Sequence, residues 1–453
     1  MKDFLKVGIS GVRGVVGETI TPQLAASFAR AFGSFVGQGE VLVGRDTRPT
    51  GYMLEQAVVA GLQSVGISVG LTGIVATPTM CHLVAERRAR GAILITASHN
   101  PVQWNALKFI GQNGMFINQK LADEFFDVYH QGEFKLAPEE ELHKVRIIAD
   151  PVRTHFEKII HYVDAARIRG RKFKVAVDCC NGVGALYSRM FLEKLGCEVV
   201  TCCDRPDGIF EREPEPLPEN LSALGELVRR ERCDIGFAQD PDGDRLAIVN
   251  EKGEPIGEDQ TLAFAVRQVL DHHAKGPVVI HLSTSLGVQW VAEQRGCQVT
   301  RAKIGEINVS TKMMEIGSVV GGEGNGGVII PAIIYCRDSF VGMAVVLELM
   351  AMAGRTVSQL RDEIPRYSLS KEKLRVQGDI VPTLLRRLRR EYAGYPLNLS
   401  DGVHVTLKDS WFHVRASNTE PVVRVVGEAP TREEAVNLTG SIMAKIRQWM
   451  AEK

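Results

Sequence analysis

The stretch LQSVGISVGL at residues 62–71 joins the end of a helix-like run to a glycine and then to an alternating apolar strand. The glycine stands where the C-terminus of a helix needs a left-handed residue. The same form recurs in LEKLGCEVVTC (192–202) and AEQRGCQVTRA (292–302), and a further strand and loop precede each copy. Strand, loop, helix, glycine and strand make up a βαβ unit. Because the copies lie roughly one domain length apart, we expect three related α/β domains with mixed or mostly parallel sheets.

The end of the chain follows a different pattern. GVHVTLKDSWFHVRAS (402–417) alternates like antiparallel strands, and TREEAVNLTGSIMAKIRQWM (431–450) indicates an amphipathic helix with a threonine N-cap. These patterns predict a small α+β domain, separated from the third α/β domain by a linker at 366–376. The expected fold is three similar α/β domains plus a small C-terminal α+β domain around a central cleft. The expected domain bounds are 1–150, 151–253, 254–366 and 367–453.

Composition excludes several classes of protein. Lys plus Arg equals Asp plus Glu, at 54 each, which argues against a general nucleic-acid or anionic-membrane binder. No apolar run approaches the roughly 20 residues of a membrane span, and the first residues lack the apolar segment of a secretory leader. The nine cysteines include the neighbours Cys179–Cys180 and Cys202–Cys203 but no CxxC pair. An odd count without metal-ligand spacing indicates reduced thiols and a cytoplasmic protein.

The first of four chemically suited loops is TASHNPVQWNALK (96–108). It follows an apolar strand at 92–95, and open α/β sheets bind ligands beyond such strand ends. Ser98 and His99 fit a hydrolase pair poorly, because adjacent residues on an extended chain point to opposite sides and no G-x-S-x-G turn is present. A turn without chemistry is the alternative.

The second loop, FAQDPDGDRLAIV (237–249), places Asp240, Asp242 and Asp244 on one tight turn. Alternating carboxylates offer oxygen ligands that suit a hard cation such as Mg²⁺, and the spacing is not that of an EF-hand. Arg245 follows directly and is placed to offset this charge or to contact a phosphate. A solvated acidic turn is the alternative.

The third and fourth loops carry polar groups of two kinds. GGEGNGG (321–327) holds Glu323 and Asn325, which are good partners for sugar hydroxyls, although a tight hairpin between two apolar strands is the alternative. VRASNTEPVVRVVGE (414–428) surrounds a turn with guanidinium, hydroxyl and amide groups that suit a phosphate cradle. Its candidate residues are Arg415, Ser417, Asn418, Thr419 and Arg424. An ordinary hydrogen-bonded turn is the alternative here.

The loops fall one in each expected domain. Together they offer a hydroxyl nucleophile, a metal clamp, a reader of hydroxyl groups and a phosphate cradle. A phosphosugar enzyme with a central cleft needs this set, with a phosphoryl group on Ser98 balanced by the metal.

In this order, TASHNPVQWNALK, DPDGDR, GEGNGG and RASNTEP resemble the four signature loops of the α-D-phosphohexomutase superfamily, over the whole chain. The resemblance implies an isomerase that moves a phosphate between a hexose 1-phosphate and 6-phosphate through an enzyme phosphoserine and a 1,6-bisphosphate intermediate. It also implies three α/β domains and a TATA-binding-protein-like C-terminal domain. Phosphoglucosamine mutase is the favoured activity and phosphomannomutase/phosphoglucomutase the alternative. A non-catalytic sugar-phosphate binding protein is the alternative from another class.

The resemblance also implies roles for individual residues. The phosphate would sit on Ser98, and Lys108 is the leading candidate base, with a pKa lowered by its surroundings and with His99 as runner-up. Arg13 would lie near the phosphoserine. One Mg²⁺ per chain would be held by Ser98, Asp240, Asp242 and Asp244. The substrate would be bound by Glu323, Asn325, Arg415, Ser417, Asn418, Thr419, Arg424 and Arg245.

Two departures from the usual motifs accompany the resemblance. Ala106 stands where glycine is common, and GEGNGG replaces the usual G-E-x-S-G-H, a form similar to the archaeal-type phosphoglucosamine mutases and their bacterial relatives. Glu306 stands where some members carry histidine, and a carboxylate there would favour an ammonium group on the sugar. Further expectations are a glucose- or glucosamine-1,6-bisphosphate activator, no nucleic-acid or membrane partner, and a monomer or homodimer. GRDTR (44–48) matches a further signature that we interpret as structural.

Overall fold

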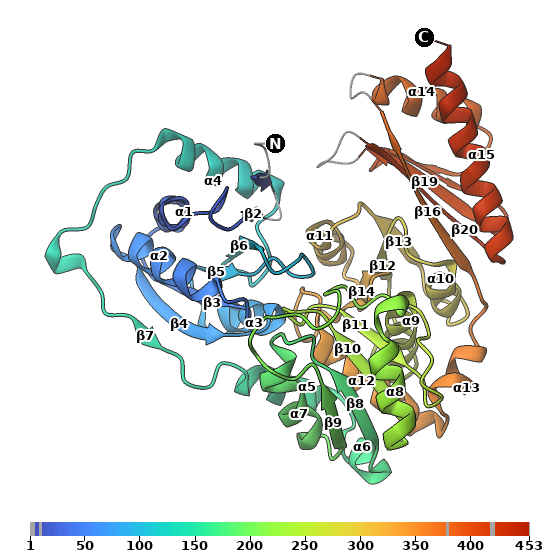
Figure 1. Cartoon of the computed structure of the whole chain (residues 1–453), viewed down its shortest axis with the longest axis horizontal. Helices are drawn as coiled ribbons and strands as arrows, with labels where there is room; N and C mark the ends of the chain where they lie inside the picture. Colours follow the sequence, from blue (N-terminus) through green and yellow to red (C-terminus); the bar gives the residue numbers. More distant parts are fainter. Residues whose placement is uncertain (1–4, 9–10, 377–379, 417–421, 453) are drawn as a thin grey trace.

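The computed structural model describes residues 5–8, 11–376, 380–416 and 422–452, and Figure 1 shows them as successive units along the chain. The first unit contains β1 (Lys6–Gly8), β2 (Gly11–Val15), α1 (Pro22–Val36), β3 (Glu40–Arg45), α2 (Gly51–Gln63), β4 (Ser68–Ile74), α3 (Thr77–Arg87), β5 (Gly91–Ile95), β6 (Trp104–Gly111), α4 (Gln119–Gln131) and β7 (Arg146–Ile147). The second contains α5 (Arg153–Tyr162), α6 (Ala165–Arg171), β8 (Lys174–Asp178), α7 (Gly184–Lys194), β9 (Glu198–Cys202), α8 (Ser222–Glu231), β10 (Ile235–Gln239) and β11 (Leu246–Val249).

Two further units complete the chain. The third contains α9 (Glu258–Gln268), β12 (Val278–His281), α10 (Leu286–Glu293), β13 (Val299–Ala302), α11 (Glu306–Ile316), β14 (Val320–Glu323), β15 (Gly327–Ile329), α12 (Ser339–Ala353) and α13 (Val357–Asp362). The fourth contains β16 (Ser368–Arg375), α14 (Val381–Glu391), β17 (Leu397–Asn398), β18 (Val403–Thr406), β19 (Trp411–Ala416), β20 (Val422–Ala429) and α15 (Arg432–Ala451).

The first three units share one sheet core. Its strand order is β4-β3-β5-β6 in the first unit, β9-β8-β10-β11 in the second and β13-β12-β14-β15 in the third. In each core the first three strands are parallel and the last is antiparallel. The fourth unit has an antiparallel sheet in the order β16-β20-β19-β18-β17. The prediction of three similar α/β domains with mixed sheets and a C-terminal α+β domain is confirmed.

The repeated glycine acts as the sequence indicates. Gly66, Gly196 and Gly296 follow α2, α7 and α10 with φ of +77°, +79° and +69°. Only glycine adopts this left-handed backbone at no cost, so each helix ends near it and the chain turns into the outermost strand of the shared four-strand core. The last helix, α15, begins at the predicted N-cap, where Thr431 and Glu434 form a capping box.

One hydrophobic core continues through the second and third units and reaches α3 of the first. Met80 and Val84 of α3, Phe156 of α5 and Phe340 of α12 belong to this same buried cluster. A separate cluster under α1 and α4 is rich in phenylalanine. The first three units are therefore joined by buried apolar contacts rather than by polar linkers alone. Among the described residues, no helix is both long and apolar enough to cross a bilayer.

The prediction that residues 366–376 form a linker is wrong. Most of it forms β16, which pairs with β20 over eight residues as an edge of the C-terminal sheet. The connection from the third unit is thus confined to the few residues after α13. Alternation in RYSLSKEKLRV is weak because both of its faces carry charge, which explains why its sequence did not indicate a strand.

The C-terminal sheet docks on the third unit through polar contacts. Glu428 accepts hydrogen bonds from Trp411 Nε1 at 2.8 Å and from Leu286 N, the first residue of α10, at 2.7 Å. Ser283 Oγ lies 3.0 Å from His413 Nδ1. Trp411 also lies under the Arg301 guanidinium and against the ring of His404.

We expect this interface to weaken in acid through His404. Burial, with Arg301 and His413 nearby, lowers the pKa of His404 to about 3. Below about pH 6.5 the His404 ring is protonated in the unfolded chain but stays neutral in the folded chain. The free energy of unfolding therefore decreases as the pH falls below this value, by about 2 kcal/mol at about pH 5. His404→Phe keeps the ring against Trp411 but cannot titrate. Thermal unfolding of both proteins between pH 7 and 5 should show the wild type losing more stability, and parallel pH profiles would contradict this assignment.

Candidate active site

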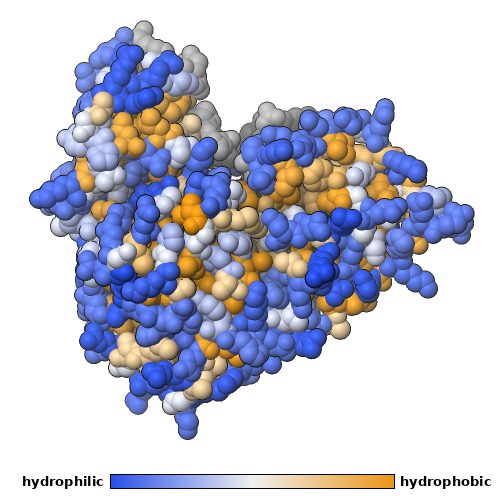
Figure 2. Space-filling view, turned by 180° about the vertical axis from the view of Figure 1, so that it is seen from behind, coloured by the Kyte–Doolittle hydropathy of each residue, from blue (hydrophilic) through white to orange (hydrophobic). Residues whose placement is uncertain are grey.

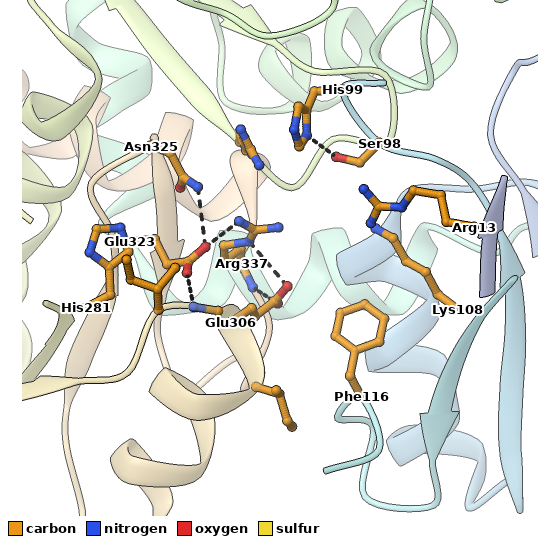
Figure 3. A pocket seen from close by; sticks show the side chains of 14 residues that line it. Arg13, Ser98, His99, Lys108, Phe116, His281, Glu306, Glu323, Asn325 and Arg337 are labelled. Atoms are coloured by element: carbon orange, nitrogen blue, oxygen red, sulfur yellow. Dashed lines mark hydrogen bonds and ion pairs between the residues drawn. The ribbon is translucent and has the colours of Figure 1, made fainter. Parts of the chain in front are cut away.

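Loops of the first three units meet at one cleft, which the C-terminal sheet borders. A cavity of about 270 Å³ lies between the first three units, and a groove of about 670 Å³ beside it reaches the C-terminal sheet. Figure 2 shows from behind the notch that separates the N-terminal and C-terminal units. The cavity is lined by Arg13, Ser98, His99, Lys108, Phe116, Arg245, His281, Ile304, Gly305, Glu306, Ile307, Glu323, Asn325 and Arg337 (Figure 3).

Three of the loops occupy the same place in their units. Ser98 lies between β5 and β6, Asp240 to Asp244 lie between β10 and β11, and Asn325 lies between β14 and β15. Each loop is thus the turn from the third to the fourth strand of the shared core. Because the parallel strands of a unit end at one edge, three copies facing one another bring these turns together.

Ser98 is held at the centre of the site. Its backbone has φ +49°, and its amide donates to Thr96 Oγ1 at 2.9 Å. Its side chain donates to Asp240 Oδ2 at 2.9 Å and lies 3.3 Å from His99 Nδ1. The expectation that Ser98 and His99 point to opposite sides is wrong, because the left-handed backbone at Ser98 replaces the extended chain on which that argument rested. Burial, with Arg245 and Arg13 nearby, holds the pKa of His99 well below its usual value.

The Ser98 loop is clamped by a residue to which the sequence assigned only a structural role. The Arg48 guanidinium is fully buried and donates to the carbonyl oxygens of Ser98, Asn100, Pro101 and Trp104 at 2.6–3.1 Å. Its Nε donates to Asp46 Oδ2 at 3.1 Å, and Thr96 Oγ1 donates to the same oxygen. One cation therefore fixes four carbonyl groups of the loop that carries Ser98.

Replacing Arg48 by lysine should leave the charge but lose the planar fork. We expect kcat to fall by about 10²-fold, because a lysine cannot hold four carbonyl groups and a misplacement of the loop by about 1 Å is enough for such a loss. Steady-state kinetics of Arg48→Lys, with Arg45→Lys as the matched control on the adjacent strand end, measures this. Equal kcat values in both variants would show that the clamp does not position Ser98.

The aspartate turn forms a compact oxygen cluster. One carboxylate oxygen from each of Asp240, Asp242 and Asp244 lies within 4.8 Å of the other two, and all three side chains are buried. Asp240 Oδ1 accepts the amides of Asp244 and Arg245 at 3.1 Å. Asp242 Oδ1 and Asp244 Oδ1 have no hydrogen-bond partner in the described part of the chain. Buried carboxylate oxygens without partners are costly unless a cation binds them, so the donor set fits a hard cation such as Mg²⁺.

Lys108 does not have the lowered pKa that was expected. Its Nζ donates to Asp242 Oδ2 at 2.7 Å. Burial acts to lower its pKa, but Asp242 and Asp244 outweigh burial and raise it. The expectation considered the metal and arginine charges near Lys108 and overlooked the direct contact with Asp242. Thr77, at the N-terminus of α3, donates to the same oxygen at 2.7 Å.

Arg337 links the aspartate turn to Glu323 of the third unit. The sequence did not indicate Arg337 as a site residue. Its Nη2 donates to Asp244 Oδ2 and its Nη1 to Glu323 Oε2, each at 2.5 Å. Its Nε lies 3.2 Å from Glu306 Oε2, and its amide donates to Glu306 Oε1 at 2.8 Å. The only sequence signal is an arginine beside the N-cap Asp338 of α12, which carries no indication of its partners.

Glu323 and Asn325 lie together on the third-unit wall of the cavity (Figure 3). Glu323 Oε1 accepts the Gly305 amide at 3.0 Å, and Oε2 accepts Asn325 Nδ2 at 3.3 Å besides Arg337. Despite burial, Arg337 and His281 lower the pKa of Glu323 to about 2, so it is an anion. Asn325 Oδ1 is buried and lacks a partner among the described residues, which leaves it available to a hydroxyl group.

Two predicted arginines complete the cavity. Arg13 Nη1 donates to Asn100 Oδ1 at 2.8 Å, within the Ser98 loop. Arg245 Nη1 donates to Glu215 Oε1 at 2.6 Å. Both line the cavity with Ser98, so two guanidinium groups share this cavity with the serine hydroxyl.

The C-terminal unit contributes a row of cations to the groove. Arg415 of β19 lies opposite Arg424 of β20, which lies opposite Lys373 of β16, and all three line the groove. Like charges directly across strands repel, so an anion bound there would relieve the row. Lys373 was not predicted, because its strand was taken as a linker. Ser417, Asn418 and Thr419 lie outside the described residues.

Comparisons with known proteins match this arrangement over the whole chain. The family descriptions phosphoglucomutase/phosphomannomutase, alpha/beta/alpha domains I, II and III match residues 5–136, 153–253 and 257–367, and the C-terminal domain of the same family matches 373–445. A protein of Methanopyrus kandleri named "Probable phosphoglucosamine mutase" is 36% identical over 98% of both chains. A "Phosphoglucomutase/phosphomannomutase" of Thermococcus kodakarensis is also 36% identical, over 94% of this chain and 95% of its own.

Solved structures show the same fold. A phosphoglucomutase/phosphomannomutase family protein from Burkholderia thailandensis aligns with a TM-score of 0.84 at 26% identity, over 96% of this chain and 95% of its own. An Aspergillus fumigatus N-acetylphosphoglucosamine mutase, solved with GlcNAc-6P and magnesium, aligns with a TM-score of 0.58 at 15% identity, over 98% of this chain and 96% of its own. The second likeness concerns the fold alone.

Proposed function

The chain belongs to the phosphoglucomutase/phosphomannomutase family of the α-D-phosphohexomutase superfamily, and from this premise we propose that it interconverts glucosamine 1-phosphate and glucosamine 6-phosphate. The activity class is that of a phosphohexomutase, an isomerase. One observation carries the assignment of the site to this chemistry. A buried serine hydroxyl is hydrogen-bonded to one of three clustered carboxylates, within a cavity that three arginines and the Asn325 amide also line.

The proposed reaction begins with a phosphate on Ser98. Asp240, Asp242 and Asp244, with that phosphate, would hold one Mg²⁺, which when bound supplies positive charge beside the transferring phosphoryl group. Arg13 and Arg245 line the same cavity as Ser98, which supports the proposal that they bind the oxygens of the transferring phosphoryl group. Ser98 gives its phosphoryl group to the substrate hydroxyl and later accepts the other phosphate from the bisphosphate intermediate.

Substrate orientation is proposed to depend on opposite ends of the cleft. Arg415 and Arg424, with Ser417, Asn418 and Thr419, would grip the phosphate that does not react, while Glu323 and Asn325 contact ring hydroxyls. Holding one phosphate in this way fixes the distance from the reacting hydroxyl to Ser98, and positioning supplies much of the catalysis in phosphoryl transfer. A hexose 1,6-bisphosphate is the proposed activator, because it delivers a phosphate to an unmodified Ser98.

Two residues compete as the proton acceptor. Lys108 Nζ lies against the metal carboxylate Asp242, whereas His99 Nδ1 lies beside Ser98 Oγ. Single-turnover transfer from phosphorylated enzyme in Lys108→Met and His99→Leu separates them, because only the loss of the acceptor flattens the pH dependence of the transfer step.

A substrate panel tests the proposed sugar. The kcat/KM values of glucosamine, glucose and mannose 1-phosphates are compared at saturating Mg²⁺. Each substrate is assayed in the presence of its own 1,6-bisphosphate. We expect the highest kcat/KM for glucosamine 1-phosphate, in line with the relatives' names. A higher value for glucose or mannose would assign the alternative, phosphoglucomutase/phosphomannomutase activity. Glu306 lines the cavity but already pairs with Arg337, so it provides weaker support for an ammonium group than the sequence indicated.

The cellular setting is also a proposal. None of the nine cysteines is in a disulfide, which supports the reducing conditions of a cytoplasmic protein. The proposed partners are phosphosugars alone, and the assembly is proposed to be a monomer or homodimer. The domain bounds 1–150, 151–253, 254–366 and 367–453 remain our proposal.

A further inference from the structure

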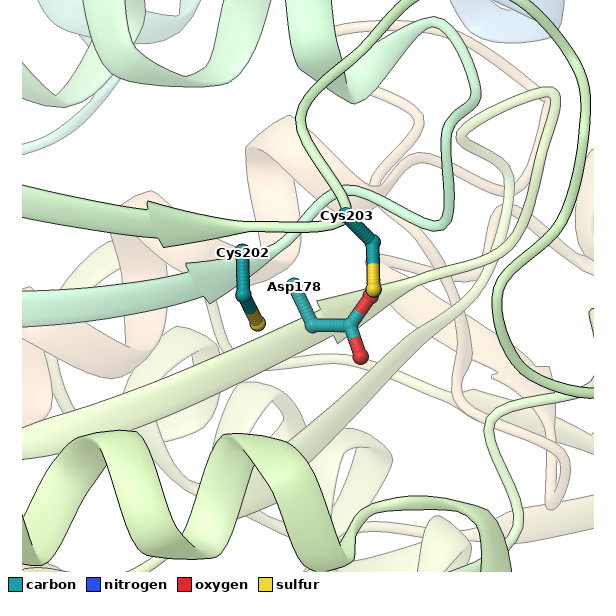
Figure 4. Close-up of side chains that lie close together, drawn as sticks. All are labelled: Asp178, Cys202 and Cys203. Carbon is teal, nitrogen blue, oxygen red and sulfur yellow. The ribbon is translucent and has the colours of Figure 1, made fainter.

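A second group of metal-ligand atoms lies outside the cleft. Among the described residues, two groups of side chains come close enough to hold a metal ion, and one of them is the aspartate turn. The other consists of Asp178, Cys202 and Cys203, with one ligand atom of each within 4.8 Å of the other two (Figure 4). Its members come from the ends of β8 and β9.

Strand pairing fixes this group. β8 and β9 are parallel neighbours, and Asp178 is the register partner of Cys202. Beyond the strands, Cys179 N donates to Cys202 O at 3.1 Å and Asn181 N donates to Cys203 O at 2.7 Å. Cys203 has φ +48°, which turns its side chain from the extended alternation so that two neighbouring thiols lie near one carboxylate. Backbone hydrogen bonds between the two strand ends therefore hold the three side chains near one another.

The surroundings supply matching charge. The Asp178 carboxylate is buried, accepts the Cys180 amide at 2.9 Å and pairs with Arg212 Nε at 2.8 Å. Two thiolates and one carboxylate carry three negative charges, which a divalent cation and the Arg212 guanidinium would balance. Cys202 and Cys203 are half-buried, so an ion can reach the sulfurs from solvent.

We propose that Asp178, Cys202 and Cys203 form a second metal site, for a thiophilic divalent cation such as Zn²⁺. Sulfur ligands distinguish it from the oxygen-only aspartate turn, which favours Mg²⁺. Zn–S bonds of about 2.3 Å place two ligand sulfurs less than about 4 Å apart, a spacing that small rotations of the half-buried thiols reach. Three protein ligands leave one position for water. On binding, each thiol releases its proton to solvent, and no oxidation or reduction occurs.

This site would act on the cleft through the strap, which we define as residues 203–217. Cys203 begins the strap, and Phe210 farther along it lies under the Arg48 guanidinium that clamps the Ser98 loop. Arg212 bonds both Asp178 and Gln239 O, and Glu215 pairs with Arg245. A cation at the root of the strap would therefore stabilise a segment that contacts two active-site arginines. The site does not depend on the proposed sugar.

Cobalt(II) provides the direct test, because thiolate–cobalt bonds absorb in the near ultraviolet whereas carboxylate–cobalt bonds do not. Metal-free protein in excess Mg²⁺ is titrated with Co²⁺ under reducing conditions. We expect one equivalent to give the charge-transfer band, Zn²⁺ to abolish it, and Cys202→Ser and Cys203→Ser each to lose it. Cys297→Ser, at a half-buried thiol of the third unit, is the matched control and should keep the band.

A second measurement needs no variant. Alkylation of the wild-type thiols is followed by peptide mass spectrometry with and without Zn²⁺, and we expect at least about a tenfold slowing at Cys202 and Cys203 and none at Cys297. Absence of the cobalt band in the wild type, its survival in both cysteine variants, or equal alkylation with and without Zn²⁺ would overturn the proposal.

Discussion

Ser98→Ala is expected to reduce mutase turnover by about 10⁴-fold or more, because both phosphoryl transfers of the proposed reaction pass through the Ser98 hydroxyl. Ser98 Oγ donates to Asp240 of the carboxylate cluster, and Arg48 donates to the carbonyl groups of its loop. The backbone at Ser98 already has a φ of +49° with a serine side chain, and alanine adds no further strain there. The variant should therefore fold. A coupled assay of 1-phosphate to 6-phosphate conversion measures the loss.

The control for Ser98→Ala is Ser27→Ala, at a half-buried serine whose hydroxyl donates to Gln23 O of its own helix. It should match the wild type in turnover and thermal unfolding. If Ser98→Ala kept wild-type turnover while remaining free of phosphate, another residue would have to carry the phosphoryl group. Substrate affinity, measured by calorimetry with glucosamine 6-phosphate, should change little, because Arg415 and Arg424 lie on another wall of the cleft.

The second large effect is expected at the metal turn. Asp244→Asn keeps the shape of the side chain but removes one negative charge from the cluster, so we expect kcat to fall by about 10²–10³-fold and Mg²⁺ affinity to weaken. Asp244 Oδ1 is one of the buried oxygens without a partner, and Oδ2 is held by Arg337. The neutral asparagine would also remove one of the negative charges that balance the Arg337 guanidinium. Activity as a function of Mg²⁺ concentration measures both effects.

Metal removal provides the matching test on the unchanged protein. Chelation should abolish turnover, and added Mg²⁺ should restore it. Asp123→Asn, at an exposed carboxylate that accepts a bond only from Gln119, is the control and should respond to Mg²⁺ as the wild type does. Full turnover of chelated protein, or equal Mg²⁺ dependence in Asp244→Asn and the wild type, would contradict the role of this turn.

Local signals in the sequence were sufficient for the architecture. The glycines at 66, 196 and 296 follow equivalent helices, and each lies just before the outermost strand of the shared core, which is β4, β9 or β13. Alternation and the Thr431 cap predicted the C-terminal sheet and helix. These signals act over a few residues, and therefore they can be recognised in a single sequence. The shared place of the three functional turns in the sheet order needed strand pairing, which involves residues far apart.

The partners of the site residues were the part that sequence could not provide. Arg337 reaches Asp244 across 93 positions and Arg48 reaches Ser98 across 50, and nothing near either arginine indicates those distances. Lys108 was assigned a lowered pKa from the charges expected around it, but one carboxylate at 2.7 Å reverses the direction. The argument against a contact between Ser98 and His99 assumed an extended backbone, and a single left-handed residue removes that assumption.

The central claim is that Ser98 carries the phosphate and passes it to the sugar. Protein labelled with isotopic phosphate is first mapped by peptide mass spectrometry and then mixed with unlabelled hexosamine 1-phosphate in a single turnover. The account predicts one label per chain, on Ser98, that moves to the bisphosphate and the 6-phosphate while unlabelled phosphate replaces it on the serine. A label that stays on the protein through turnover, or that maps to another residue, would contradict it.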